Sequence, residues 1–118
     1  MSFWRQQVIQ PSLDSDLHAA IEEQVSILQH DPSNPRAHFA LGTLRHLQGN
    51  TKAAVALFER AIALDPQYPA PHVSLGRIHA VEGRYEDAWR HAREAAALGD
   101  RSLLSQMKRY PDVAPEMR

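Results

Sequence analysis

The sequence contains no cysteine. Without cysteine the chain can form no disulfide, hold no metal through thiolates and use no thiol nucleophile, which fits a reducing compartment. An excess of charge of either sign is also missing, because 13 basic and 14 acidic residues leave a net charge of −1. A broad cationic surface for nucleic acid or anionic lipid is therefore not expected.

Long apolar runs are absent as well. The longest, residues 53–58, is far shorter than the roughly 18 residues that a membrane-spanning helix needs. The first seven residues lack a basic start followed by an apolar stretch, so no signal peptide is predicted. We predict a protein of a bacterial-type cytoplasm, with neither a membrane nor a nucleic acid as its partner.

Motifs that carry catalysis are not found. The chain has no phosphate-binding glycine loop and no nucleophile motif. Its paired acids, Glu22-Glu23 and Glu86-Asp87, fall early in predicted helices, where they complement the positive end of the helix dipole. The sequence therefore predicts no enzyme, no catalytic residue and no cofactor.

The sequence does contain an internal repeat. Identical residues recur at a constant separation of 34 positions (76 − 42 = 34), at Gly42/Gly76, Gly49/Gly83, Leu41/Leu75, Ala54/Ala88, Ala61/Ala95 and Leu64/Leu98. A period of this length is typical of stacked helical hairpins, in which no unit buries its apolar face without a neighbour.

Prolines and glycines fall where such hairpins must start, stop or turn. Proline follows the predicted helix ends in Asp31-Pro32 and Asp65-Pro66, and it opens helices in Asn34-Pro35 and Tyr68-Pro69. The helices predicted between these stops, at residues 35–48, 51–64, 69–82 and 85–98, turn at Gly49 and Gly83. They form two antiparallel hairpins.

The two units resemble tetratricopeptide repeats. The family's signature positions are occupied by Leu41-Gly42, Gly49, Ala54, Phe58, Ala61 and Pro66, and in the second unit by Leu75-Gly76, Gly83, Tyr85, Ala88 and Ala95. The resemblance implies an all-α superhelix of stacked antiparallel helical hairpins. The sequence departs from the family pattern at the tryptophan position (His38, His72), the tyrosine position (Arg45, His79), one aromatic position (Ala92) and a proline position (Asp100).

The same register extends into both flanks. We predict an N-terminal apolar segment at 1–14 with a degenerate first helix interrupted at Pro11, followed by a tetratricopeptide-like domain at 15–109. This domain comprises a partial repeat at 15–34, repeats at 35–68 and 69–100, and a capping helix at 101–109 that covers the last hairpin with Leu103, Leu104 and Met107. The tail at 110–118 is expected to be extended or disordered.

The family resemblance also implies a function. First helices of successive hairpins would line a concave groove that binds a peptide or helix of another protein, through Arg36, Phe39, Thr43, His46, Leu47, Ala70, Val73, Arg77, Ala80 and Val81. The lysine and asparagine with which some relatives clamp a terminal carboxylate are absent, which disfavours a chaperone-tail adaptor. In the alternative interpretation, Phe39 and Val73 pack against the neighbouring repeat and Arg36 and Arg77 are solvated. Both interpretations stay open at this stage.

A second function hypothesis is self-assembly. The apolar residues Phe3, Trp4, Val8 and Ile9 could dock on their own chain, fill its groove or cross to a second copy in a homo-oligomer.

The seven histidines raise the question of a metal site. His38 and His72 stand at equivalent positions, but no helix has two histidines four residues apart, and the pattern indicates no carboxylate at a ligand spacing beside them. We predict no metal site and expect His38 and His72 to be half-buried substitutes for aromatic residues. His18, His30 and His91 are predicted to be ordinary residues of the helix surface.

Overall fold

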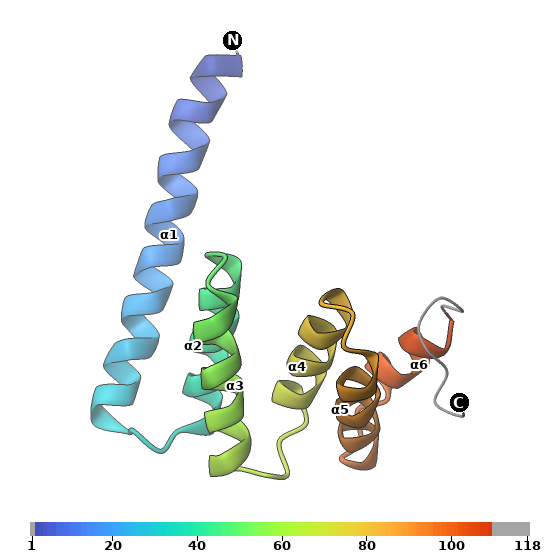
Figure 1. Ribbon diagram of the computed structural model, residues 1–118. Coiled ribbons are helices and arrows are strands. Elements are labelled where there is room, and N and C mark those ends of the chain that lie inside the picture. The colour runs from blue at the N-terminus through green and yellow to red at the C-terminus, as the bar shows by residue number, and fades with distance from the viewer. Residues whose placement is uncertain (1, 110–118) are drawn as a thin grey trace.

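The computed structural model describes the backbone of residues 2–109 and the side chains of residues 14–109. Within these residues there are helices and no strand, as the all-α prediction required. Figure 1 shows the helices in a row that follows the order of the chain: α1 (Ser2–His30), α2 (Pro35–Leu47), α3 (Thr51–Leu64), α4 (Ala70–Val81), α5 (Tyr85–Ala97) and α6 (Ser102–Lys108). The four predicted repeat helices agree with α2 to α5 to within one residue at each end.

Glycine closes the first helix of each hairpin. Gly49 and Gly83 have φ angles of 84° and 79°, in the left-handed region that residues with a Cβ rarely adopt. The N–H of Gly49 donates to the carbonyl of His46 at 2.9 Å, and that of Asn50 to the carbonyl of Arg45 at 2.9 Å. These two bonds satisfy carbonyls that the end of α2 leaves free, and they turn the chain back into α3.

Polar side chains close the opposite ends of several helices. Asn34 and Asn50 each accept a hydrogen bond from the backbone N–H three residues on, at 3.0 and 3.2 Å. Such caps satisfy donors that have no partner in the first turn of a helix. Before α6, the carboxylate of Asp100 accepts the backbone N–H of Ser102 at 3.0 Å and its hydroxyl at 2.6 Å.

An apolar cluster joins the two hairpins. Phe58 of α3, which is 2% exposed, packs with Leu75 and Ile78 of α4. The ring of Phe58 also lies over Gly42 of α2, where an added Cβ would come within 2.8 Å of it. The two repeats therefore lie side by side and share a buried surface, as stacking requires.

A second cluster joins α4, α5 and α6. Leu103, Leu104 and Met107 of α6 are buried against Trp89 of α5 and other core residues of the second hairpin. Leu103 lies so close to Gly76 of α4 that the position has no room for a Cβ. The short last helix thus covers the apolar face that the second hairpin would otherwise expose to water.

The N-terminal helix differs from the prediction. We expected an interruption at Pro11, but α1 is one helix that continues through this proline. Proline removes one backbone hydrogen bond and disturbs one turn, and that local cost of about 3 kcal/mol does not by itself end a helix whose other turns remain bonded. The expected apolar cluster of Phe3, Trp4, Val8 and Ile9 involves side chains outside the described residues, and the predicted tail at 110–118 also lies outside them.

None of the described helices combines the length and the apolar character that crossing a bilayer demands.

Candidate binding groove and histidine cluster

A cavity of about 320 Å³ opens between the two hairpins. Its walls come from α2, from α4 and the residue that follows it, and from α3, and it is lined by Thr43, His46, Thr51, Phe58, Ser74, Arg77, Ile78, Val81 and Glu82. Phe58 and Ile78 are buried members of the apolar cluster between the hairpins, so the cavity reaches that core. Its volume lies at the lower end of the range for ligand sites, about 300–1,000 Å³.

The rim of this cavity carries two kinds of group. Val81 is 89% exposed, which leaves an apolar side chain in water. Arg77 is also exposed and offers a guanidinium that can bind a carboxylate through two hydrogen bonds. The hydroxyl of Thr43 donates to the carbonyl of Phe39 at 3.1 Å, so its proton already has an acceptor within the chain.

Four of the predicted groove residues come together at this cavity. They are Thr43 and His46 of α2 and Arg77 and Val81 of α4.

Other predicted groove residues lie elsewhere. Val73 is 6% exposed and belongs to the core shared by α4, α5 and α6, and Ala80 packs against the same cluster. Val73 and Ala80 therefore do not line this cavity, because they lie on the side of α4 that packs against α5 and α6. Leu47 is 68% exposed and borders a different hollow between α1 and α2, together with Leu17 and His18.

Phe39 and Arg36 belong to an aromatic contact at the start of α2. The ring of Phe39 lies 5.5 Å from that of Phe58 and 5.6 Å from that of Tyr68, between centroids. The guanidinium of Arg36 lies 4.7 Å from the centre of the Tyr68 ring, a cation–π distance. The packing interpretation therefore accounts for the contacts of Phe39, and Arg36 has a partner within the chain.

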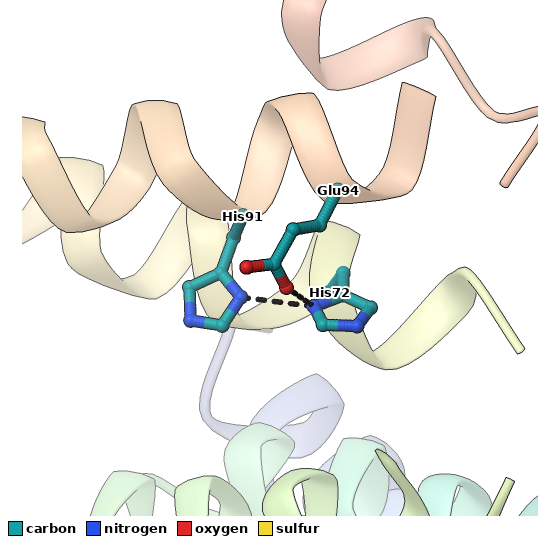
Figure 2. A group of neighbouring side chains, drawn as sticks. All are labelled: His72, His91 and Glu94. Atoms are coloured by element: carbon teal, nitrogen blue, oxygen red, sulfur yellow. Dashed lines mark hydrogen bonds and ion pairs between the residues drawn. The ribbon is translucent and has the colours of Figure 1, made fainter. Parts of the chain in front are cut away.

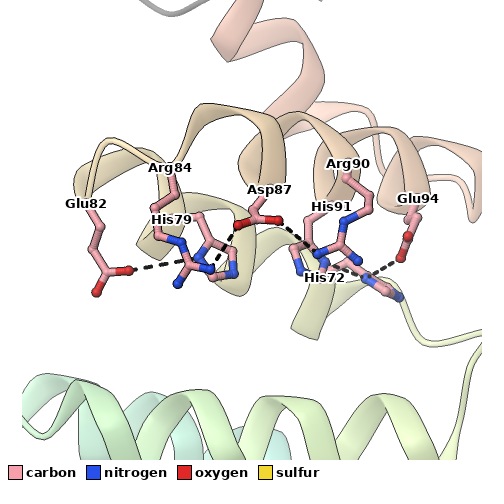
Figure 3. Close-up of polar contacts among 8 residues, drawn as sticks. All are labelled: His72, His79, Glu82, Arg84, Asp87, Arg90, His91 and Glu94. Atoms are coloured by element: carbon pink, nitrogen blue, oxygen red, sulfur yellow. Dashed lines mark hydrogen bonds and ion pairs between the residues drawn. The ribbon is translucent and has the colours of Figure 1, made fainter.

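The second hairpin carries a row of polar side chains that was not predicted from the sequence. Figure 3 shows this row along α4, α5 and the turn that joins them: Glu82, His79, Arg84, Asp87, Arg90, His91, His72 and Glu94. Asp87 binds Arg84 at 3.0 Å and Arg90 at 3.2 Å, between guanidinium nitrogen and carboxylate oxygen. A carboxylate between two guanidiniums is held ionised, and the hydrogen bond from Arg90 is the largest cause of the lowered pKa of Asp87.

Two histidines meet at the end of this row. His72 of α4 and His91 of α5 are 7% and 8% exposed, and their Nδ1 atoms lie 3.0 Å apart. The Nδ1 of His72 also lies 3.1 Å from Oε2 of Glu94 (Figure 2). Burial lowers the pKa of His72, and the nearby Arg90 adds to this effect although Glu94 opposes it. Burial, reinforced chiefly by Arg90, lowers the pKa of His91 to about 4.

The prediction that His91 is a surface residue was wrong. His91 follows Ala88 by three residues, and that spacing places it on the buried side of α5 between Ala88 and Ala95. It also precedes Glu94 by three residues, so a carboxylate does stand at a spacing that brings two side chains together on one helix face. Both spacings were visible in the sequence. The contact of His91 with His72 of α4 was not, because it depends on how the two helices pack.

His79 extends the histidine cluster. Its ring is stacked on that of His91, with 5.5 Å between centroids and 16° between planes. Its buried Nδ1 makes no hydrogen bond within the described part of the chain and lies 3.9 Å from Oε1 of Glu82. The stacking holds the His91 ring in place between two helices.

The fold and the groove define a helical-repeat protein of stacked hairpins. Comparison with known families matches the tetratricopeptide repeat over residues 15–69 and again over residues 45–97. The chain belongs to the tetratricopeptide repeat family. Repeats of this family generally mediate protein–protein interactions and typically act as non-catalytic scaffolds. Comparison with curated proteins gave no match.

Proposed function

We propose that this protein is a non-catalytic interaction module that binds a peptide or a helix of another protein in the groove between α2 and α4. The observation that carries the proposal is the cavity at this groove, which joins a buried apolar base to an exposed rim. Neighbouring repeats of a superhelix offer such a surface because their first helices lie next to each other.

The lining of the cavity indicates the chemistry of the partner. Phe58 and Ile78 at the base favour an apolar side chain, which would release water from the cavity and cover Val81. Arg77 at the rim favours a carboxylate placed beside that anchor. We therefore propose a segment with an apolar residue and an aspartate or glutamate close to it.

The test is to select peptides from a random display library on the full chain and to measure their affinity. Selected peptides should share an apolar residue with an adjacent acid. Replacing Arg77 by Glu should weaken their binding at least about tenfold, since an ion pair becomes a repulsion. Val81→Asp should also weaken it, because it places a charge where the apolar anchor enters.

Arg60→Glu is the matched control. Arg60 is exposed on α3, does not line the cavity and undergoes the same change of charge. It should leave the affinity unchanged. Peptides that bind wild type, R77E and V81D equally well would show that the groove is not the binding site.

Self-assembly is the second candidate, and the length of α1 favours it. Figure 1 shows the N-terminal half of α1 extending past the α2/α3 hairpin, so this part of the helix has no neighbour among the described helices. A second copy could pack against it. Light scattering should then give a dimer for the full chain and a monomer for a chain that lacks residues 1–10. A monomer in both cases would contradict this candidate.

A further inference from the structure

Three potential metal ligands converge between α4 and α5. They are Nδ1 of His72, Nδ1 of His91 and a carboxylate oxygen of Glu94, and all lie within 4.8 Å of one another. Figure 2 shows the three side chains pointing toward one another, His72 from α4 and the other two from α5. This cluster is separate from the groove, since none of its members lines the cavity described above.

One proton serves all three atoms. The 3.0 Å contact between the two Nδ1 atoms requires one to donate and the other to accept. Because a carboxylate only accepts, the short contact to Glu94 assigns the proton to Nδ1 of His72. That single N–H is shared between His91 and Glu94, whereas a cation would take a lone pair from each of the three atoms.

We propose that Nδ1 of His72, Nδ1 of His91 and the carboxylate of Glu94 form a binding site for a divalent transition-metal ion of the Zn²⁺ class. Imidazole nitrogen with carboxylate oxygen is a donor set that suits Zn²⁺, Cu²⁺ and Ni²⁺, while Mg²⁺ and Ca²⁺ prefer oxygen alone. Three protein ligands leave room for a water molecule at a tetrahedral ion.

The separations suit such an ion. Ligand atoms bonded at about 2.0–2.1 Å to a tetrahedral Zn²⁺ lie about 3.3 Å from each other. The observed separations of 3.0 and 3.1 Å from His72 differ from this value by a few tenths of an ångström. The third separation, between Nδ1 of His91 and the Glu94 carboxylate, is within 4.8 Å, and rotation of the partly exposed Glu94 side chain can bring it to the same value.

The site is also accessible. The side chain of Glu94 is 44% exposed while that of His72 is 8% exposed, so the cluster is open to solvent on the side of the carboxylate. An ion could enter there and exchange two of its water ligands for the nitrogens of the two buried imidazoles. Because the ligands come from two helices, binding would connect α4 to α5 and stabilise the hairpin.

Neighbouring charges set the affinity. Arg90 lies close enough to lower the pKa of both histidines, and its positive charge opposes a cation. Its hydrogen bond to Asp87 partly offsets this charge. Replacing Arg90 by Gln should therefore tighten ion binding several-fold.

The experiment is calorimetric titration of the metal-free full chain with ZnCl₂, together with thermal unfolding in the presence and absence of Zn²⁺. We expect one ion per chain and a melting temperature that rises with Zn²⁺ concentration and does not rise with MgCl₂. Each of His72→Gln, His91→Gln and Glu94→Gln should weaken binding at least about tenfold, a loss expected when a ligand is removed.

The control is the exposed pair His18 and Glu22 on α1. Nε2 of His18 lies 2.9 Å from the carboxylate of Glu22, so this pair offers Zn²⁺ a surface site with two ligands. His18→Gln should leave the affinity and the melting shift unchanged. Loss of binding in H18Q, or its survival in all three ligand variants, would overturn the proposal, as would a wild-type chain that binds no Zn²⁺.

Glu94→Gln keeps the experiment decisive if the buried histidine variants fail to fold, because Glu94 is partly exposed and the change is isosteric. A second measurement reports on the atoms themselves. Zn²⁺ should shift the side-chain ¹⁵N resonances of the Nδ1 atoms of His72 and His91 in wild type, and unchanged resonances would contradict the site.

Discussion

The two hairpins of this protein have the same register and different interiors. In the α2/α3 hairpin, Phe58 fills the space beside Gly42. At the equivalent positions 34 residues later stand Ala92 and Gly76, and the space beside Gly76 is filled by Leu103 from α6. The side chain that fills the space beside the glycine thus comes from the same hairpin in the first repeat and from the capping helix α6 in the second.

Polar residues differ between the hairpins in the same way. His38 and His72 are equivalent, but Nε2 of His38 lies 2.9 Å from the carbonyl of Pro32, whereas His72 pairs with His91. The position of His91 is occupied in the first hairpin by Leu57. The comparison teaches that a repeat can keep its helices and turns while one copy exchanges apolar contacts for a buried histidine cluster.

The largest effect is expected from removing the large side chain that fills the core of the first hairpin. Phe58→Ala should lower the free energy of unfolding by about 3–5 kcal/mol, because it opens a cavity against Gly42, Leu75 and Ile78. Urea unfolding followed by circular dichroism measures this loss. Leu47→Ala, which truncates an apolar side chain that is 68% exposed, should change it by less than about 0.5 kcal/mol. Equal losses in both variants would show that Phe58 is not a core residue.

The next largest effect is a pH dependence of the free energy of unfolding, which arises from the buried histidines of the second hairpin. The pKa of His91 is lowered from 6.5 to about 4 in the folded chain, so between these values the unfolded chain binds a proton that the folded chain does not. The free energy of unfolding should therefore fall as the pH falls from about 6.5 to about 4, by about 3 kcal/mol, with His72 acting in the same direction. Asp87, whose pKa is lowered from 3.8, loses its contribution only at lower pH.

Urea titrations between these pH values, in the presence of a chelator, measure this dependence. His91→Gln should flatten it, since that residue no longer has to be buried without its proton. His30→Gln replaces an exposed histidine and should leave the dependence as in wild type. A wild-type profile that is flat between pH 6.5 and 4 would rule out a buried neutral His91.

The smallest effect sharpens the contrast between the two glycines. Gly76→Ala should destabilise wild type by about 1–3 kcal/mol, because the new methyl group meets Leu103. In a Leu103→Ala background the same change should cost almost nothing. Gly42→Ala should keep its cost in that background, since its neighbour is Phe58. A double-mutant cycle by urea unfolding gives the coupling, and additive costs for Gly76 and Leu103 would contradict the contact.

Much of the fold was predictable because helices and turns depend on local sequence. Proline at Pro35, glycine at Gly49 and Gly83, and the 34-residue period were enough to place four helices. The groove was only partly predictable. Thr43 and Arg77 line the cavity as expected, but Val73 does not, because which side of α4 meets α6 depends on a helix about 30 residues further along the chain.

The histidine cluster shows the same limit. The spacing of His91 and Glu94 was visible in the sequence, yet His72 joins them only because α4 and α5 pack as an antiparallel pair in one particular rotation about their axes. The expected break at Pro11 also depended on context, since a local cost does not decide whether a long helix continues.

The sequence by itself determined the repeat, the helix boundaries and the turns, because backbone hydrogen bonding and glycine or proline conformations act over a few residues. Only the tertiary structure decided which faces of α4 and α5 are buried, where the cavity opens and which donors meet. Those outcomes depend on side chains that are distant in sequence coming within a few ångströms, and no local pattern specifies that distance.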